Sequence, residues 1–203
     1  MGTSTLSGPQ LAVESVCAGV DTLLAAELWR LPGTKQADLI DELETVGRQL
    51  EFAKLLVLAD FDARGIAGEQ HALSTAAFLR DRLRVSPSEA AARVRAAREL
   101  IPGTAPSGQE VAPVLPATAA GMVAGVLSPE HARVISHAMR KFPTGLDPAA
   151  RTDAETTLAT HARALDPAAL AISRAPGYRA AGHRRDCPAA GLRCVHHPHG
   201  ARR

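Results

Sequence analysis

Residues 86–100 read SPSEAAARVRAAREL, and this stretch contains the signals of a capped helix. Ser86 is placed to accept a hydrogen bond from an N–H of the first turn, and Pro87 occupies a position whose N–H has no partner inside a helix. Glu89 follows Ser86 by three residues and predicts a capping box. The apolar side chains that then recur at helical spacing are Ala90, Val94, Ala97 and Ile101. The stretch therefore predicts a helix over 87–101 with one buried face.

The same pairing of a side-chain oxygen with proline recurs further along the chain, at Ser128-Pro129, Asp147-Pro148 and Asp166-Pro167. Each pair should begin a helix. Together with the apolar periodicity, these signals predict helices over 11–29, 35–64, 75–84, 87–101, 113–124, 129–141 and 148–165. A further short helix after Asp166 would end by Ser173. Residues 102–113 are rich in Pro, Gly, Ser and Thr and predict a loop.

The composition favours an all-α fold. Apolar residues make up 46% of the 203-residue chain but aromatic residues only 3%, so the core must consist of Leu, Val, Ile and Ala. Such small side chains suit closely packed helices better than a β-sandwich. We expect about seven helices in one helical domain over residues 11–173, preceded by a disordered N-terminus at 1–10. Cys17 lies in an apolar helical stretch and is interpreted as a small buried residue.

The predicted helix at 35–64 has two contrasting faces. Its apolar positions are Leu39, Leu43, Val46, Leu50, Ala53, Val57 and Phe61. The other face is charged and includes Glu44 and Arg48 at the i, i+4 spacing of a stabilising ion pair. The sequence therefore predicts that the apolar positions face the core and that the charged face is solvated.

No stretch of about 18 consecutive apolar residues could span a bilayer. The first ten residues also lack the basic segment and apolar core of a signal peptide. The expected location is therefore the cytoplasm, without a membrane partner.

The last 30 residues, 174–203, differ in composition from the rest of the chain. They hold 7 Arg, 4 His and 2 Cys but one acidic residue, which leaves 16 basic and 20 acidic residues in the preceding 173. The tail thus carries about six positive charges and the preceding part about four negative ones. Since the tail has too few apolar residues to bury a core, it is predicted to be disordered. Its arginines would bind phosphate groups without sequence specificity.

Two thiols and two imidazoles in this tail are of the type that binds zinc, at Cys187, Cys194, His196 and His197. Adjacent histidines cannot easily both face one ion, so no metal and no other cofactor is predicted. The alternative origin is a shifted reading frame, because GC-rich codons read out of register give Arg, Ala, Gly, Pro and His. The reading frame after Ile172 would distinguish a frameshift product from a basic arm or a metal site.

The motif GVLSPEHARVI at residues 125–135, with Phe142-Pro143 after it, and the helix at 86–102 before it, resemble an actinobacterial family. The family is the domain of unknown function 222, also called the 13E12 repeat family, and the resemblance covers Leu11 to Ala171. It implies a helical domain without assigned activity, often found with mobile elements and commonly preceding an HNH-type nuclease domain. The expectation is an N-terminal domain that has lost its nuclease portion, because no complete HNH core precedes Arg203. The chain is therefore not expected to be an enzyme.

The segment from Ser74 to Leu100 has the lengths of a helix-turn-helix, the kind of motif that places a helix on DNA. The proposed phosphate contacts are Arg84, Arg93, Arg95 and Arg98. Arg84 stands where the turn usually has glycine. The alternative interpretation is an ordinary pair of helices whose arginines are solvated and partly paired with Asp81, Glu89 and Glu99.

The motif helix contains Glu130, His131 and His137, a combination that could suggest acid–base chemistry. Catalysis needs a base, a nucleophile and an orienting group together, and no metal, nucleotide or hydrolase motif accompanies these residues. Local packing or hydrogen bonding is the expected role of these histidines.

Two other functions stay open. The long amphipathic helices could form an interaction module that pairs with another helical chain or with a second copy of itself. An exposed apolar stripe on the helix at 35–64 would favour this alternative. The second is a non-functional remnant with a folded helical part and a disordered tail.

Overall fold

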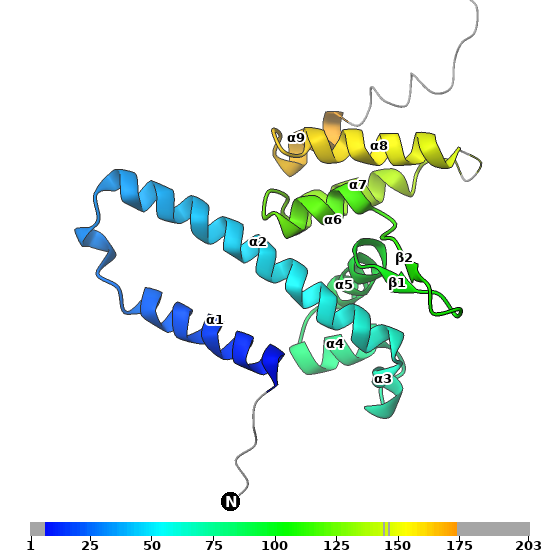
Figure 1. The fold of residues 1–203 in the computed structure, drawn as a ribbon, viewed down its shortest axis with the longest axis horizontal. Coiled ribbons are helices and arrows are strands. Elements are labelled where there is room, and N and C mark those ends of the chain that lie inside the picture. Colours follow the sequence, from blue (N-terminus) through cyan, green and yellow to red (C-terminus); the bar gives the residue numbers. More distant parts are fainter. Residues whose placement is uncertain (1–6, 144, 146, 174–203) are drawn as a thin grey trace, which may run out of the picture.

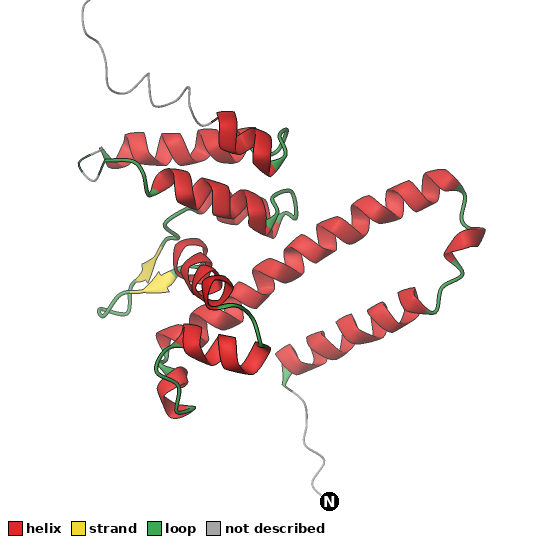
Figure 2. Ribbon diagram, turned by 180° about the vertical axis from the view of Figure 1, so that it is seen from behind, coloured by secondary structure: helices red, strands yellow, loops and turns green. Residues whose placement is uncertain are grey.

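The structure of this chain is a computed structural model that describes residues 7–143, 145 and 147–173 (Figure 1). The described residues form nine α-helices, a single 3-10 turn and two short antiparallel strands (Figure 2). The α-helices are α1 (Gly8–Leu24), α2 (Gly33–Ala63), α3 (Ile66–Glu69), α4 (Thr75–Leu83), α5 (Pro87–Leu100), α6 (Pro116–Val123), α7 (Pro129–Met139), α8 (Pro148–His161) and α9 (Pro167–Ser173). The 3-10 turn η1 covers Leu28–Arg30, and the strands are β1 (Gly103–Thr104) and β2 (Glu110–Val111).

The all-α prediction is confirmed, with more helices than the seven expected. The short helix predicted after Asp166 is present as α9, and the four-residue α3 has no counterpart in the prediction. Three boundaries are corrected. The helix predicted over 11–29 ends at Leu24, and Leu28–Arg30 form a separate 3-10 turn. α1 begins at Gly8, inside the segment 1–10 predicted to be disordered, and the predicted loop at 102–113 contains the β1–β2 ribbon.

The four oxygen–proline signals begin helices as expected. Ser86 Oγ accepts a hydrogen bond from the Glu89 N–H at 3.1 Å, and Ser128 and Asp147 cap their helices in the same way. Asp166 Oδ1 accepts from two N–H groups of α9 at 2.9 Å. The second half of the predicted capping box at Ser86 is wrong, because the Glu89 carboxylate instead accepts a hydrogen bond from Arg93 at 2.9 Å.

The core lies between α2, α5, α6, α7 and α8, where α5, α6 and α7 pack against α2 and α8 packs against α6 and α7. Leu127, Ile135 and Leu170 are fully buried, and Leu100 and Met122 are 1% exposed. From α2 the buried side chains are Phe52, Leu55 and Leu58. Aliphatic side chains thus make up nearly all of this core, as the composition predicts.

The turn between α6 and α7 is built around Gly125, whose φ of 71° lies in the left-handed region that favours glycine. A Cβ at this position would lie 2.8 Å from the backbone oxygen of Thr45 on α2. Arg48 Nη1 donates to the Val126 carbonyl at 3.0 Å, and Gln49 Nε2 donates to the Val123 carbonyl at 3.1 Å. α2 therefore docks on this turn through polar contacts to carbonyl groups that the end of α6 leaves open.

A buried carboxylate joins α8 to α6. Glu155 is 1% exposed and accepts hydrogen bonds from Thr118 N at 2.7 Å, Thr118 Oγ1 at 2.5 Å and Ala117 N at 3.2 Å. The N-cap position of α6 is Leu115, which has no side-chain oxygen to cap the helix. Glu155 therefore caps α6 from a neighbouring helix, where a negative charge also suits the helix dipole.

α1 and the first half of α2 run antiparallel, joined through η1, and extend away from the rest of the molecule (Figure 1, Figure 2). We call residues 8–50 the N-terminal helical hairpin. α1 has no buried residue along its length. The interpretation of Cys17 as a buried residue is therefore wrong, since its side chain is exposed on α1.

Candidate functional site

Five of the seven apolar positions predicted to face the core on α2 are exposed instead, whereas Leu39 and Phe61 are half-buried. Leu43, Val46 and Leu50 are 43%, 57% and 43% exposed, and Val57 is 71% exposed. We call these four residues the outer stripe. With about 100° between successive residues of a helix, the outer stripe lies nearly opposite the buried side chains Phe52, Leu55 and Leu58.

The reason for this correction is the mixed chemistry of the buried face of α2. That face also holds Arg48, which is half-buried and bonds to the α6–α7 turn, and Asp62, which bonds to α4 and α5. Apolar periodicity alone therefore predicts the outer stripe as the buried face of α2. The face that does pack on the core contains polar residues, and their partners lie far away in the sequence. The predicted ion pair between Arg48 and Glu44 is present at 2.8 Å.

The exposed apolar surface continues along α1 and the tip of the N-terminal helical hairpin. Its large side chains outside the outer stripe, each between 38% and 81% exposed, are Leu11, Val13, Val16, Val20, Leu24, Leu28, Trp29, Leu31 and Ile40. Single exposed apolar residues are ordinary on protein surfaces, whereas contiguous patches beyond a few hundred Å² mark interaction sites (about 300–600 Å² is the usual maximum).

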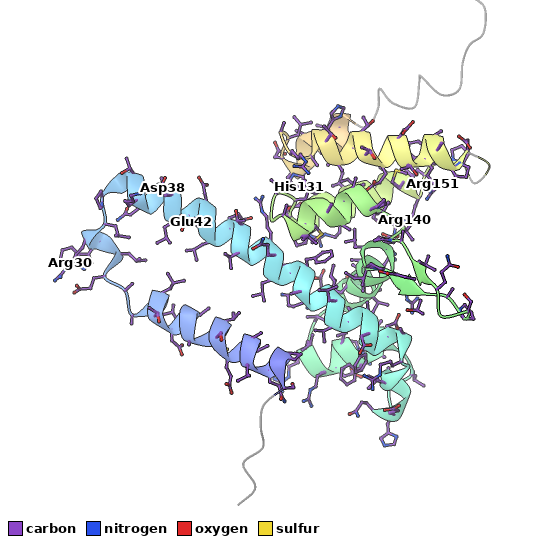
Figure 3. The ribbon with its side chains drawn as sticks, viewed as in Figure 1. Arg30, Asp38, Glu42, His131, Arg140 and Arg151 are labelled. Atoms are coloured by element: carbon purple, nitrogen blue, oxygen red, sulfur yellow. The ribbon has the colours of Figure 1, made fainter. Side chains whose placement is uncertain are left out.

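The hairpin is also acidic. Its residues 8–50 include seven acidic side chains and three basic ones, Arg30, Lys35 and Arg48. All three basic groups are in ion pairs, Arg30 with Glu27 at 2.9 Å, Lys35 with Asp38 at 3.2 Å and Arg48 with Glu44. Figure 3 shows Arg30 at the tip of the hairpin and Asp38 and Glu42 along α2. An apolar surface with acidic surroundings is thus the main feature of this part of the molecule.

A pocket of about 300 Å³ lies between α2, α5, α6 and α7. Leu55, Leu100 and Met122 are among the apolar side chains that line it. The charged side chains around it are Arg93, Arg95, Arg133, Arg140, Glu51, Glu89 and Glu99. Chemically, this arrangement suits a group with an apolar part and a polar end.

Two of the four arginines predicted to contact nucleic acid, Arg93 and Arg95, line this pocket, while Arg84 and Arg98 do not. Arg93 is paired with Glu89 at 2.9 Å, and Arg98 is paired with Asp62 at 2.7 Å. Arg84 and Arg95 are exposed and form no ion pair within the described residues.

Arg84 ends α4 with a φ of 56°, in the left-handed conformation that glycine adopts more easily. Helix-turn-helix motifs usually have glycine at this position of the turn.

Two further arginines at the pocket, Arg133 and Arg140, were missed in the sequence reasoning. Arg133 approaches the Glu89 carboxylate at 3.5 Å. With His137 they occupy positions i, i+4 and i+7 of α7, the spacing that places side chains on one face of a helix. That spacing is the signal that could have found them.

Asp62 connects three helices. Its carboxylate accepts hydrogen bonds from Arg98 Nε at 2.7 Å on α5 and from Thr75 Oγ1 at 2.6 Å on α4. The Arg98 hydrogen bond lowers the pKa of Asp62 most strongly, burial opposes this effect, and the Thr75 hydroxyl lowers the pKa further. The same contact raises the pKa of Arg98. The arrangement stabilises the junction of α2, α4 and α5 rather than forming a reactive site.

The motif helix uses His131 for structure. His131 is 7% exposed, its Nδ1 lies 2.8 Å from Ser128 Oγ, and its Nε2 lies 2.8 Å from the Leu165 carbonyl oxygen. His137 lines the pocket, but Glu130 is not among the pocket residues. The expectation of local hydrogen bonding is confirmed for His131.

The residues considered for zinc, Cys187, Cys194, His196 and His197, lie outside the described part of the chain, as does the tail predicted to be disordered. Within the described residues, no group of three or more His, Cys, Asp or Glu side chains could hold a metal ion. No helix in the same part of the chain is both long and apolar enough to cross a bilayer.

Comparison with protein families gives a match to a domain of unknown function, DUF222, over residues 37–175. The chain belongs to this family. The matched DUF222 region includes the core helices and nearly all of α2, whereas α1 lies before it.

The DUF222 motif at 125–135 has a structural explanation, because Gly125 forms the turn, Ser128 caps α7, and Leu127, His131 and Ile135 are buried. The motif therefore specifies the α6–α7 corner and does not by itself indicate an activity.

Two similar proteins come from Mycobacterium tuberculosis, and both are described as uncharacterized. One, in strain H37Rv, is 40% identical over 82 residues, which cover 40% of this chain and 18% of the relative. Another, in strain CDC 1551 / Oshkosh, is 28% identical over 160 residues, which cover 79% of this chain and 38% of the relative. The chain thus matches well under half the length of these relatives. No solved structure matches the chain.

Proposed function

We propose that this DUF222 chain is a helical protein–protein interaction module whose binding surface is the exposed apolar face of the N-terminal helical hairpin. The single observation that carries this proposal is the outer stripe, which lies opposite the buried face of the same helix α2. A helix with one face in the core and an apolar face in water presents a surface on which another amphipathic helix can pack.

The proposal fits the rest of the chain. The DUF222 motif is accounted for by caps, a turn and core packing, and His131 by two local hydrogen bonds. The charged groups at the α2–α4–α5 junction pair with one another. The apolar surface of the hairpin, in contrast, packs on no other part of the described chain.

The test is capture of partners by the full chain and by the double variant Val46→Glu/Leu50→Glu, with chemical cross-linking at Lys35 in the hairpin. We expect one helical partner to cross-link to the unaltered chain and to be absent with the variant. The matched control is Val111→Glu, which places a charge at a 49% exposed valine of β2 away from the hairpin. A partner that is captured equally by all three proteins contradicts the proposal.

A second candidate function is binding to the DNA backbone, as part of a nuclease-associated or mobile-element system. It is favoured by Arg84 and Arg95, which are exposed and without an ion pair within the described residues. Arg93 and Arg98 are poorer candidates, since each would have to exchange a carboxylate partner for phosphate.

The measurement is duplex-DNA affinity across a range of salt. Each phosphate contact that is removed should lower the salt slope by about one. Arg84→Ala/Arg95→Ala should therefore lower it by about two, and Arg93→Ala/Arg98→Ala should change it little. Equal losses in both variants would contradict the assignment of Arg84 and Arg95.

A further inference from the structure

We infer that the partner of the N-terminal helical hairpin is a second copy of the same chain, and that two hairpins pack face to face into a four-helix bundle. This inference rests on the proposed function, because it names the occupant of the same surface. It is carried by the exposed apolar side chains that α1 and α2 both present, since these two helices run antiparallel to each other in the ribbon (Figure 1).

The first step is that the hairpin needs a packing partner for its apolar side chains. α1 is a 17-residue helix with no buried residue. Helices of about 12–15 residues or fewer are marginal in water, and longer ones in proteins still draw most of their stability from packing an amphipathic face. α1 packs no such face on the rest of the described chain, so its stability has to come from a surface outside the described residues of this copy.

The second step is the size of the surface. Twelve large apolar side chains between Leu11 and Leu50 are each 38% to 81% exposed. Their combined exposed surface is on the order of the 800 Å² that each partner of a stable complex buries. A pair of hairpins would therefore bury enough apolar area for a stable dimer.

The third step is symmetry. A two-fold axis brings the same patch of both copies together, which is the commonest arrangement of homo-oligomers. Because both helices of the hairpin carry exposed apolar side chains, two hairpins supply the four helices of an antiparallel bundle. A single partner helix would cover a smaller part of this two-helix surface.

The charges permit this packing and make it distinguishable from other partners. Helical spacing places Asp41 and Glu44 on the side of α2 away from the outer stripe and Glu42 at its edge, so the first two carboxylates stay in water and the third lies at the rim when the stripe is covered. The hairpin is net acidic, with seven acidic and three basic residues at 8–50. Association of two copies should therefore strengthen as salt screens their repulsion, whereas association with a basic partner should weaken.

The experiment is sedimentation velocity of the full chain between about 1 and 100 µM, at low and at high salt. We expect a monomer–dimer equilibrium that shifts toward dimer with concentration and with salt. Val46→Glu/Leu50→Glu should raise the dimer dissociation constant by roughly 100-fold or more, because it places four charges in the bundle core. Val111→Glu, the matched control on β2, should dimerise like the unaltered chain.

Cys17 gives a second readout that does not depend on a disruptive variant. Its thiol is exposed on α1, and it can be followed alone after Cys187→Ser and Cys194→Ser. In the dimer the rate of reaction with a thiol reagent should fall as protein concentration rises. A rate independent of concentration contradicts pairing through α1.

Two results of sedimentation also overturn the inference: a monomer at every concentration and salt, or a dimer that Val46→Glu/Leu50→Glu leaves intact. If the chain is monomeric but a different protein cross-links at Lys35 in a stripe-dependent way, the inference fails and the proposed function stands. If neither a second copy nor another protein depends on the outer stripe, both fail.

Discussion

The N-terminal helical hairpin and the core formed by α5–α8 use similar apolar side chains with opposite results. Val16 and Val20 on α1 are 43% and 47% exposed, whereas Leu127 and Ile135 in the core are fully buried. The core helices are also joined by polar contacts between elements, as at Glu155. α1, in contrast, has no buried residue. Apolar periodicity therefore identifies a helix and its amphipathic face but does not tell whether that face packs within the same chain.

The strongest way to break the core while leaving the hairpin unchanged is Glu155→Ala. Removal of this carboxylate leaves Thr118 and the Ala117 N–H without their buried acceptor, so we expect the free energy of unfolding to fall by roughly 3–5 kcal/mol. Urea denaturation followed by circular dichroism measures the change. Glu130→Ala, at an exposed position of α7, should cost less than about 0.5 kcal/mol. A small effect of Glu155→Ala would show that water replaces the carboxylate as the cap of α6.

The next effect concerns the point at which the hairpin helix α2 meets the core. Gly125→Ala introduces a Cβ 2.6 Å from Thr45 Cγ2 and 2.8 Å from the Thr45 carbonyl oxygen, at a φ of 71°. We expect a loss of about 2 kcal/mol in thermal or urea unfolding, from backbone strain and from displacement of α2. The matched control is Gly47→Ala, where a Cβ meets nothing within 4 Å and should stabilise α2 by about 0.5–1 kcal/mol. Equal effects at the two glycines would mean that α2 does not dock closely on the α6–α7 turn.

Local signals in the sequence accounted for much of the fold. The oxygen–proline pairs at Ser86, Ser128, Asp147 and Asp166 begin helices because capping depends on residues close in the sequence. The orientation of α2 depends instead on contacts between distant residues. Arg48 reaches a carbonyl 78 residues away, and no local pattern indicates that acceptor.

The candidate site was predictable only in part, for the same reason. The arginines of α5 are visible as a group in the sequence, but the carboxylate that pairs with Arg98 comes from Asp62, 36 residues earlier. The alternative interpretation expects some of these arginines to pair with Asp81, Glu89 or Glu99, and this is confirmed for Arg93 with Glu89. The outer stripe was identified correctly as an apolar face, and its exposure followed from the tertiary contacts on the opposite face of α2.

The junction of α2, α4 and α5 should show a smaller, pH-dependent effect. The folded-state pKa of Asp62 is lowered below its ordinary 3.8, so its contribution is fully present above that value and is lost as the pH falls through it toward the lower folded-state pKa. Asp62→Asn should cost about 1 kcal/mol at neutral pH, a modest value because the Arg98 side chain is 67% exposed. Unfolding measured between pH 7 and about 3 should show the difference between the two proteins shrinking with acid. A difference that stays constant would assign the effect to packing.

The smallest expected effect, at Val46, distinguishes the N-terminal helical hairpin from the core most directly. In dilute monomer, Val46→Ala in the outer stripe should change the free energy of unfolding by less than about 0.5 kcal/mol, because the side chain is 57% exposed. Ile135→Ala, at a fully buried core position, should cost roughly 3–4 kcal/mol under the same conditions. At protein concentrations that favour dimer, Val46→Ala should become destabilising while the cost of Ile135→Ala stays unchanged, because only the first side chain becomes buried on association. If the effect of Val46→Ala does not depend on concentration, the hairpin stays exposed in solution and differs from the core in having no packing partner of its own kind.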